Sequence, residues 1–276
     1  MTYQHIYFSE NFPDARLEAY IHDTHAELVI DKRKAIIVCP GGGYAFLSER
    51  EAEPIALSYA AAGLNVFVLR YSLLDKASGY APLIEACLAI KYIREHCEEL
   101  KVDPKYVYIT GFSAGGHLSA WAGCMWNSPK VTEHLNGADA KICKPTATLP
   151  CYPVITSNPK YGHMGSYDVL VGNCNEEVDE TCFSLERYVD KNTSPSFIWH
   201  TATDAAVHAM NALLYAEKLC EHGVPFELHI FPCGGHGLAL CNKETWIGEP
   251  GLLNPYVEQW VKMAIHWVNE CPFEQK

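Results

Sequence analysis

The chain has 276 residues, of which 49% are hydrophobic and 20% charged, and its formal net charge is −12. This length and composition are typical of one globular α/β domain spanning 1–276. The acidic charge and the lack of a basic stripe argue against nucleic acid as a partner. The start, MTYQHIYFSENFPD, does not resemble a signal peptide, and no apolar run is long enough to cross a bilayer. We therefore expect no membrane partner and a cytoplasmic location.

The distribution of cysteines also favours a cytoplasmic location. Twelve cysteines are scattered along the chain and none forms a C-x-x-C pair. Cys39 and Cys87 lie within apolar segments, where a reduced thiol packs as a small hydrophobic group. The local cluster of Cys233, His236 and Cys241 has none of the usual zinc-site spacings. We predict reduced cysteines and no metal.

The elements alternate along the chain. The first thirty residues predict one or two antiparallel edge strands, of which 15–21 (ARLEAYI) is the better candidate. In chain order, a buried strand at 34–39 is followed by helix 51–62, strand 65–70, helix 82–97, strand 106–110 and helix 114–125. Strand 146–154, strand 197–201, helix 209–221, strand 226–231 and helix 256–269 complete the pattern. Alternating strands and helices predict a mostly parallel sheet with helices on both faces.

One segment interrupts this alternation. Residues 155–195 are rich in glycine, asparagine and acidic side chains, and a segment this long between neighbouring strands usually has a function or short elements of its own. We predict a small helical insertion beside the functional site.

The motif GFSAGG places Ser113 where the strand 106–110 gives way to the helix 114–125. G-x-S-x-G at such a junction is the nucleophile elbow, in which the glycines permit a tight turn and the serine hydroxyl projects above the sheet. The serine needs a base, and the base needs a group that orients it. In this arrangement the acid and the histidine follow the serine on loops after later strands. Asp204 follows strand 197–201 and His236 follows strand 226–231, so both match that order.

Acyl transfer also needs donors for the oxyanion that develops in its tetrahedral intermediate. One predicted donor is the backbone N–H of Ala114, directly after the nucleophile. The other comes from the triple glycine that ends strand 34–39, where Gly42 and Gly43 are the candidates. The same loop lacks the G-x-G-x-x-G spacing of a dinucleotide site.

These motifs resemble those of the α/β-hydrolase esterases of the acetyl esterase, acetylxylan esterase and lipase-like type. The resemblance extends from Ala35 onward and rests on CPGGGY, LSEREAEPIA, YVYITGFSAGGHLSAW, LPCYPVI, FIWHTATD and FELHIFPCGGHGL. It implies a serine carboxylesterase without a cofactor, in which Ser113 is the nucleophile, Asp204 the acid and His236 the base. The chain departs from the family at the acid, because Thr203 replaces the first aspartate of D-D-x-x-V-P and His208 replaces its proline.

The substrate predicted from these features is a small-molecule or oligosaccharide ester with a short acyl group, such as acetylated xylan oligosaccharides. Tyr44 and His117 are predicted to close a shallow acyl pocket. Three alternatives remain: a prolyl-peptidase-like serine peptidase, a lipase, and a non-catalytic binding module. A homodimer is a further possibility.

Overall fold

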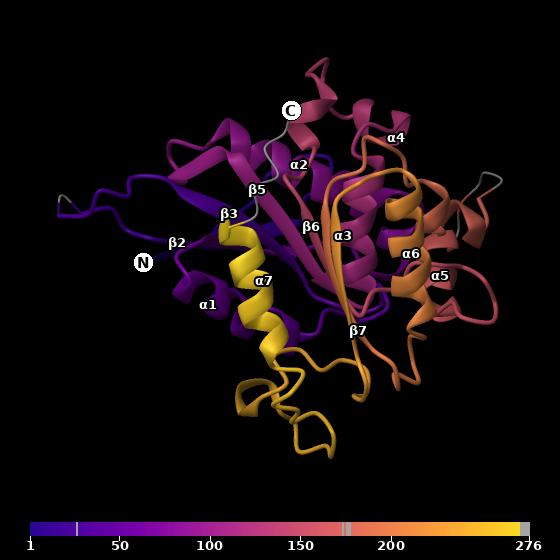
Figure 1. Cartoon of the computed structure of the whole chain (residues 1–276). Coiled ribbons are helices and arrows are strands. Elements are labelled where there is room, and N and C mark those ends of the chain that lie inside the picture. The colour runs from indigo at the N-terminus through magenta and orange to yellow at the C-terminus, as the bar shows by residue number, and fades with distance from the viewer. Residues whose placement is uncertain (26, 173, 175–177, 271–276) are drawn as a thin grey trace.

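An eight-stranded sheet forms the centre of the computed structural model, which describes residues 1–25, 27–172, 174 and 178–270 (Figure 1). Its strand order is β1-β2-β4-β3-β5-β6-β7-β8. β1 (Thr2–Ile6) pairs antiparallel with β2 (Arg16–Ile21), which pairs antiparallel with β4 (Asn65–Arg70). The antiparallel strands predicted in the first thirty residues are therefore present.

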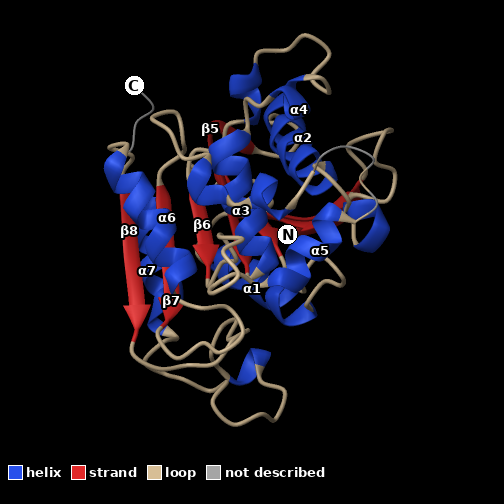
Figure 2. Cartoon of the chain, turned by 90° about the vertical axis from the view of Figure 1, so that its right-hand side faces the viewer, coloured by secondary structure: helices blue, strands red, loops and turns tan. Residues whose placement is uncertain are grey.

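The other strands run parallel to β4. They are β3 (Arg33–Cys39), β5 (Val102–Phe112), β6 (Thr148–Cys151), β7 (Ser196–Thr201) and β8 (Phe226–Phe231). Because parallel strands end at the same edge of a sheet, the loops after β3, β5, β7 and β8 meet at one edge. In Figure 2 the arrowheads of β7 and β8 point to this edge, at the lower side of the view.

Helices cover both faces of the sheet, as predicted (Figures 1 and 2). One face carries α1 (Glu53–Ala61) and α7 (Gln259–Glu270), and the other carries α2 (Ala81–Glu95), α3 (Ala114–Met125) and α6 (Met210–Glu221). The segment AIIVC in β3 explains why helices must cover both faces of the sheet. Ile36 and Val38 pack into the core beneath α1 and α7, whereas Ile37 and Cys39 pack into the core on the opposite face.

Several boundaries differ from the sequence prediction. The helix expected at 51–62 divides into a 3-10 turn, η1 (Glu49–Glu51), and α1, in whose first turn Pro54 lies. The strand expected at 146–154 is shorter, because β6 ends at Cys151 and Tyr152 turns with a φ of 35°. The helix expected at 256–269 begins three residues later, at Gln259.

The segment between β6 and β7 contains short helices, as predicted. They are α5 (Met164–Val171), η4 (Glu180–Phe183) and η5 (Leu185–Arg187). The remaining short helices are η2 (Leu74–Ala77), α4 (Pro129–Thr132), η3 (Ala140–Cys143) and η6 (Lys243–Thr245). Across the described part of the chain, no helix combines the length and apolar character that a bilayer span needs.

Candidate active site

Ser113 lies in the sharp turn between β5 and α3. Its backbone has φ 55° and ψ −115°, outside the regions that residues with a side chain normally adopt. A Cβ on Gly111 would lie 1.9 Å from the carbonyl oxygen of Gly115, and one on Gly115 would lie 2.0 Å from the carbonyl oxygen of Cys39. The turn can therefore form only because both positions of the motif lack a side chain.

The structure brings Ser113, His236 and Asp204 together from three loops at this edge. The Ser113 hydroxyl donates to Nε2 of His236 at 2.8 Å, and Nδ1–H of His236 donates to the Asp204 carboxylate at 2.7 Å. This chain of two hydrogen bonds leaves Nε2 free to accept a proton from the serine. Gly237, next to the histidine, has a φ of 68°, which suits a glycine in this tight loop.

The Asp204 carboxylate is shielded from solvent and fully hydrogen-bonded. Its side chain has no exposed surface, and its second oxygen accepts from the N–H groups of Ala206 and Val207, both at 2.9 Å. Burial alone would raise the pKa of Asp204. The hydrogen bond from His236, together with the N–H of Val207, outweighs burial and holds that pKa below its ordinary value. Asp204 is therefore ionised at neutral pH and fixes the orientation of the histidine.

The glycine loop lies directly beside the serine. The N–H of Gly41 donates to Oε2 of Glu51 at 2.8 Å, so this amide is not available to a substrate. Among the described residues, the N–H groups of Gly42 and Gly43 have no acceptor. Both have positive φ angles, 132° and 63°, and they remain the candidate oxyanion donors together with Ala114.

Tyr44 and His117 are fully buried and bond to each other. The hydroxyl of Tyr44 donates to Nδ1 of His117 at 2.7 Å, while Nε2–H of His117 donates to the carbonyl of Phe183 at 2.8 Å. Burial lowers the pKa of His117 to about 4, so the ring is neutral. The pair joins the glycine loop to α3 and to η4. A direct contact with substrate remains a prediction for both residues.

Two further groups at this edge were not identified in the sequence. Glu51 is buried at the end of η1, and its second oxygen accepts from the hydroxyl of Tyr152 at 2.6 Å. His163 and Ser166, at the start of α5, bond to each other at 2.9 Å and face Gly43. Glu51 lies in LSEREAEPIA, one of the segments on which the family resemblance rests, but that segment alone assigns the glutamate no role. His163 and Ser166 belong to none of the quoted motifs.

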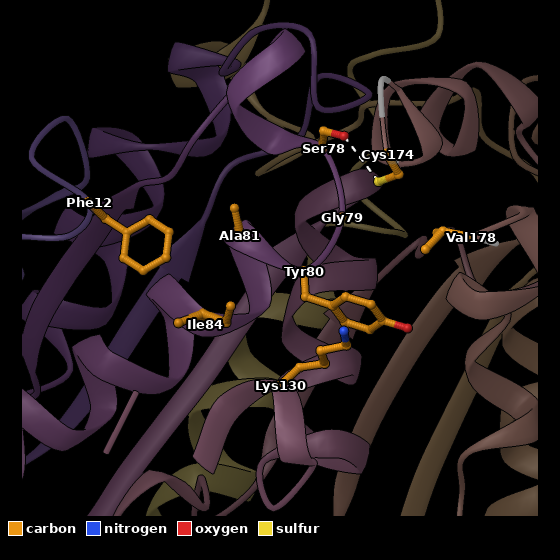
Figure 3. A pocket seen from close by; sticks show the side chains of 9 residues that line it. All are labelled: Phe12, Ser78, Gly79, Tyr80, Ala81, Ile84, Lys130, Cys174 and Val178. Atoms are coloured by element: carbon orange, nitrogen blue, oxygen red, sulfur yellow. Dashed lines mark hydrogen bonds between the residues drawn. The ribbon is translucent and has the colours of Figure 1, made fainter. Parts of the chain in front are cut away.

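A separate pocket lies beside the start of α2, and Ser113 is not among the residues that line it (Figure 3). It is lined by Phe12, Ser78, Gly79, Tyr80, Ala81, Ile84, Lys130, Cys174 and Val178. Figure 3 shows Ser78 bonded to Cys174, and the ammonium of Lys130 lies over the ring of Tyr80. None of the three residues of the hydrogen-bonded chain lines this pocket, so we do not place the reaction there.

Comparisons with known proteins support an ester-hydrolysing site. A family model described as BD-FAE matches residues 26–219. The chain is 34% identical to "Endo-1,4-beta-xylanase B" of Butyrivibrio fibrisolvens over 85% of its length, and 26% identical to "Acetylxylan esterase" of Xylanibacter ruminicola over 87%. It spans only 36% and 46% of those two proteins. The solved structure of the acetyl ester-xyloside bifunctional hydrolase from Caldicellulosiruptor lactoaceticus is 34% identical, has a TM-score of 0.81, and aligns over 96% of this chain and 95% of that one.

Proposed function

The chain belongs to the BD-FAE family and to the ester hydrolases of the α/β-hydrolase fold, and we propose that it removes acetyl groups from carbohydrate esters through an acyl-enzyme on Ser113. The observation that carries this proposal is the continuous hydrogen-bonded chain from Ser113 through His236 to Asp204, with distances of 2.8 and 2.7 Å. The names of the similar proteins support acetylated carbohydrate, such as xylan oligosaccharides, as the substrate class.

In the proposed mechanism, Oγ of Ser113 attacks the ester carbonyl while Nε2 of His236 takes its proton. The oxyanion receives hydrogen bonds from the N–H of Ala114 and from that of Gly42 or Gly43. The bond between the acyl carbon and the sugar oxygen then breaks while His236 protonates that oxygen, so the sugar leaves with a free hydroxyl and Ser113 is acetylated. Water, deprotonated by His236, releases acetate and restores the serine. Asp204 stabilises the imidazolium that forms in both steps.

The position of α5 supports a short acyl group. A Cβ built on Gly43 would lie 3.7 Å from Oγ of Ser166 and 3.9 Å from Cε1 of His163, so α5 closely approaches the candidate oxyanion loop. Ser166 is 1% exposed. We therefore propose that α5 limits the space for the acyl chain, and that length is selected by steric exclusion. An apolar pocket alone discriminates by only about 1–3 kcal/mol per methylene.

A series of aryl esters and a natural-type substrate test the proposal together. We expect kcat/KM to fall steeply from acetate to butyrate and to be nearly lost at octanoate, and acetylated xylo-oligosaccharides to release acetate. Ser113→Ala should lower turnover by several orders of magnitude, to what binding and the oxyanion donors supply. Retention of more than about a tenth of the activity would contradict the nucleophile assignment.

The same assays separate the alternatives. A preference that rises with acyl length would indicate a lipase, and cleavage of peptides in place of acetyl esters would indicate a peptidase. A binding module would show no fast reaction of Ser113 with a fluorophosphonate probe, because only an activated serine reacts rapidly.

The cellular setting is part of the proposal. Buried thiols such as Cys39 and Cys87 support a reducing compartment, as in the cytoplasm. The names of the similar esterases support a small-molecule or oligosaccharide partner, and the net charge of −12 argues against nucleic acid. A homodimer stays a prediction, which size-exclusion chromatography with light scattering can test.

A further inference from the structure

Glu51 is a buried carboxyl group that the mechanism above does not use. It is 3% exposed, and both of its oxygens accept hydrogen bonds from different parts of the chain. Oε2 accepts from the N–H of Gly41 at 2.8 Å, and Oε1 accepts from the hydroxyl of Tyr152 at 2.6 Å. The Tyr152 oxygen in turn accepts from the N–H of Ala239 at 3.0 Å. Three hydrogen bonds thus connect the glycine loop to the loop that carries His236.

Both ends of this connection lie against the reacting groups. A Cβ on Gly41 would lie 3.0 Å from Cβ of Ser113, so Gly41 packs directly on the serine. The ring of Tyr152 packs edge-on against the ring of His236, with centroids 5.2 Å apart. A shift of Glu51 would therefore move the candidate oxyanion donors next to Gly41 and would disturb the ring of the general base.

The donors around Glu51 fit its ionised form. Tyr152 has one hydroxyl proton and donates it to Oε1 of Glu51, while its oxygen accepts from the N–H of Ala239. Gly41 supplies a second donor, so both carboxyl oxygens act as acceptors. Burial outweighs the bonds from Tyr152 and Gly41 and the charge of Arg50, so the pKa of Glu51 is raised overall. Support for the ionised form comes from the donors that face both oxygens.

We propose that Glu51 is a positioning residue: through Gly41 and Tyr152 it fixes the oxyanion loop and the His236 loop relative to each other. The proposal rests on the proposed function for its effect on turnover. The coupling between the two loops is independent of that function and can be measured separately.

A matched pair of variants tests the proposal. Glu51→Gln keeps the size of the side chain but leaves one oxygen for two donors, whereas Glu53→Gln changes an exposed glutamate two residues away. Tyr152→Phe removes the hydroxyl that links Glu51 to Ala239. Each variant is examined with 4-nitrophenyl acetate, by thermal unfolding, and by the amide resonances of the protein labelled with ¹⁵N-glycine and ¹⁵N-alanine.

We expect Glu51→Gln to lower kcat by about tenfold to a hundredfold and to change KM by no more than about twofold. This loss of kcat is somewhat smaller than the loss caused by removing an oxyanion donor itself. Glu51→Gln should also shift the amide resonance of Ala239, and Tyr152→Phe that of Gly41, although neither residue touches the substituted atom. Glu53→Gln should change none of these quantities.

The results separate the two proposals. Unchanged Ala239 and Gly41 resonances would overturn the coupling, and so would a folded Glu51→Gln protein with the kcat of Glu53→Gln. A lower melting temperature with unchanged kcat would assign Glu51 a structural role only and would also overturn the inference. If wild type lacks esterase activity, or if Ser113→Ala retains it, the proposed function fails, while the amide shifts still decide whether Glu51 couples the two loops.

Discussion

Ser113 adopts a backbone conformation, φ 55° and ψ −115°, that a residue with a Cβ rarely takes. Such a conformation costs about 1–3 kcal/mol and persists only where the surroundings enforce it. Backbone hydrogen bonds hold Ser113 in this conformation. Its N–H donates to the carbonyl of Cys151, and its carbonyl accepts from the N–H groups of His117 and Val154. Strain at this position presents the hydroxyl to His236 and supports its role as the nucleophile.

Glycine at position 113 should release this strain. We expect the free energy of unfolding of Ser113→Gly to exceed that of Ser113→Ala by about 1 kcal/mol. This net value allows for the greater conformational entropy of glycine in the unfolded chain, which offsets part of the relief of strain. Both variants should lack turnover, because neither has a hydroxyl. Urea unfolding monitored by tryptophan fluorescence gives the comparison, and equal stabilities would argue against strain at this turn.

Asp204 is the proposed acid, and the family pattern around it is incomplete in this sequence. Because its carboxylate holds Nδ1 of His236 at 2.7 Å, Asp204→Asn should favour the wrong tautomer of the ring and lower kcat by up to about 10⁴-fold with little change in substrate binding. Asp168 and Asp179, both exposed on the insertion, provide matched Asp→Asn controls. If either control lost more activity than Asp204→Asn, the acid would have to be reassigned.

At the scale of elements, α5 is the part of the insertion closest to the site. Its first residues include Ser166, which bonds to Nδ1 of His163, and this pair faces Gly43 of the candidate oxyanion loop. Burial lowers the pKa of His163, so its ring is neutral at pH 7. A neutral, half-buried ring at this place can limit acyl length by its volume.

Removing that ring should widen the range of esters accepted. We expect His163→Ala to raise the ratio of kcat/KM for butyrate over acetate by about tenfold, which corresponds to making room for the extra methylenes. His222→Ala, an exposed histidine after α6, is the control. An unchanged ratio would show that other residues set the acyl limit.

At the scale of the whole molecule, the core contains two neutral histidines. Burial lowers the pKa of both His117 and His200 to about 4 from an ordinary value of 6.5. Between these values the unfolded chain binds protons that the folded chain does not, so stability decreases as pH falls from about 6.5 towards 4. Glu85 contributes with the opposite sign, because burial raises its pKa to about 7 and the folded state then binds the extra proton.

The contribution of His117 to this pH dependence can be measured by comparing the unfolding free energies of wild type and His117→Gln. His117→Gln cannot titrate, and at pH 7 it should be less stable than wild type because bonds to Tyr44 and Phe183 are weakened. Between pH 7 and pH 4.5 the wild type loses the contribution of His117, so the gap in unfolding free energy should shrink by about 2–3 kcal/mol. Urea titrations at the two pH values measure it. A gap that stays constant would mean that His117 is not held neutral by the fold.

Much of the architecture follows from local sequence signals. Continuous apolar runs such as AIIVC can be buried only between two layers of helices, and the alternation of such runs with helical segments leads to a mostly parallel sheet. The G-x-S-x-G motif indicates its own turn, because its glycines occupy positions where a Cβ would overlap backbone atoms. Order along the chain was enough to select Asp204 and His236 as partners of the serine.

The tertiary structure decided what depends on contacts between distant segments. The sequence left Gly42 and Gly43 as equivalent candidate donors, and only the folded chain shows that the amide of the neighbouring Gly41 is taken by Glu51. Glu51 and Tyr152 are 101 residues apart, so no local pattern indicates that they bond. His163 and Gly43 likewise meet only when α5 folds over the edge of the sheet. Local propensities and motif order reflect short-range sterics and hydrophobic periodicity, whereas these pairings depend on the packing of the whole chain.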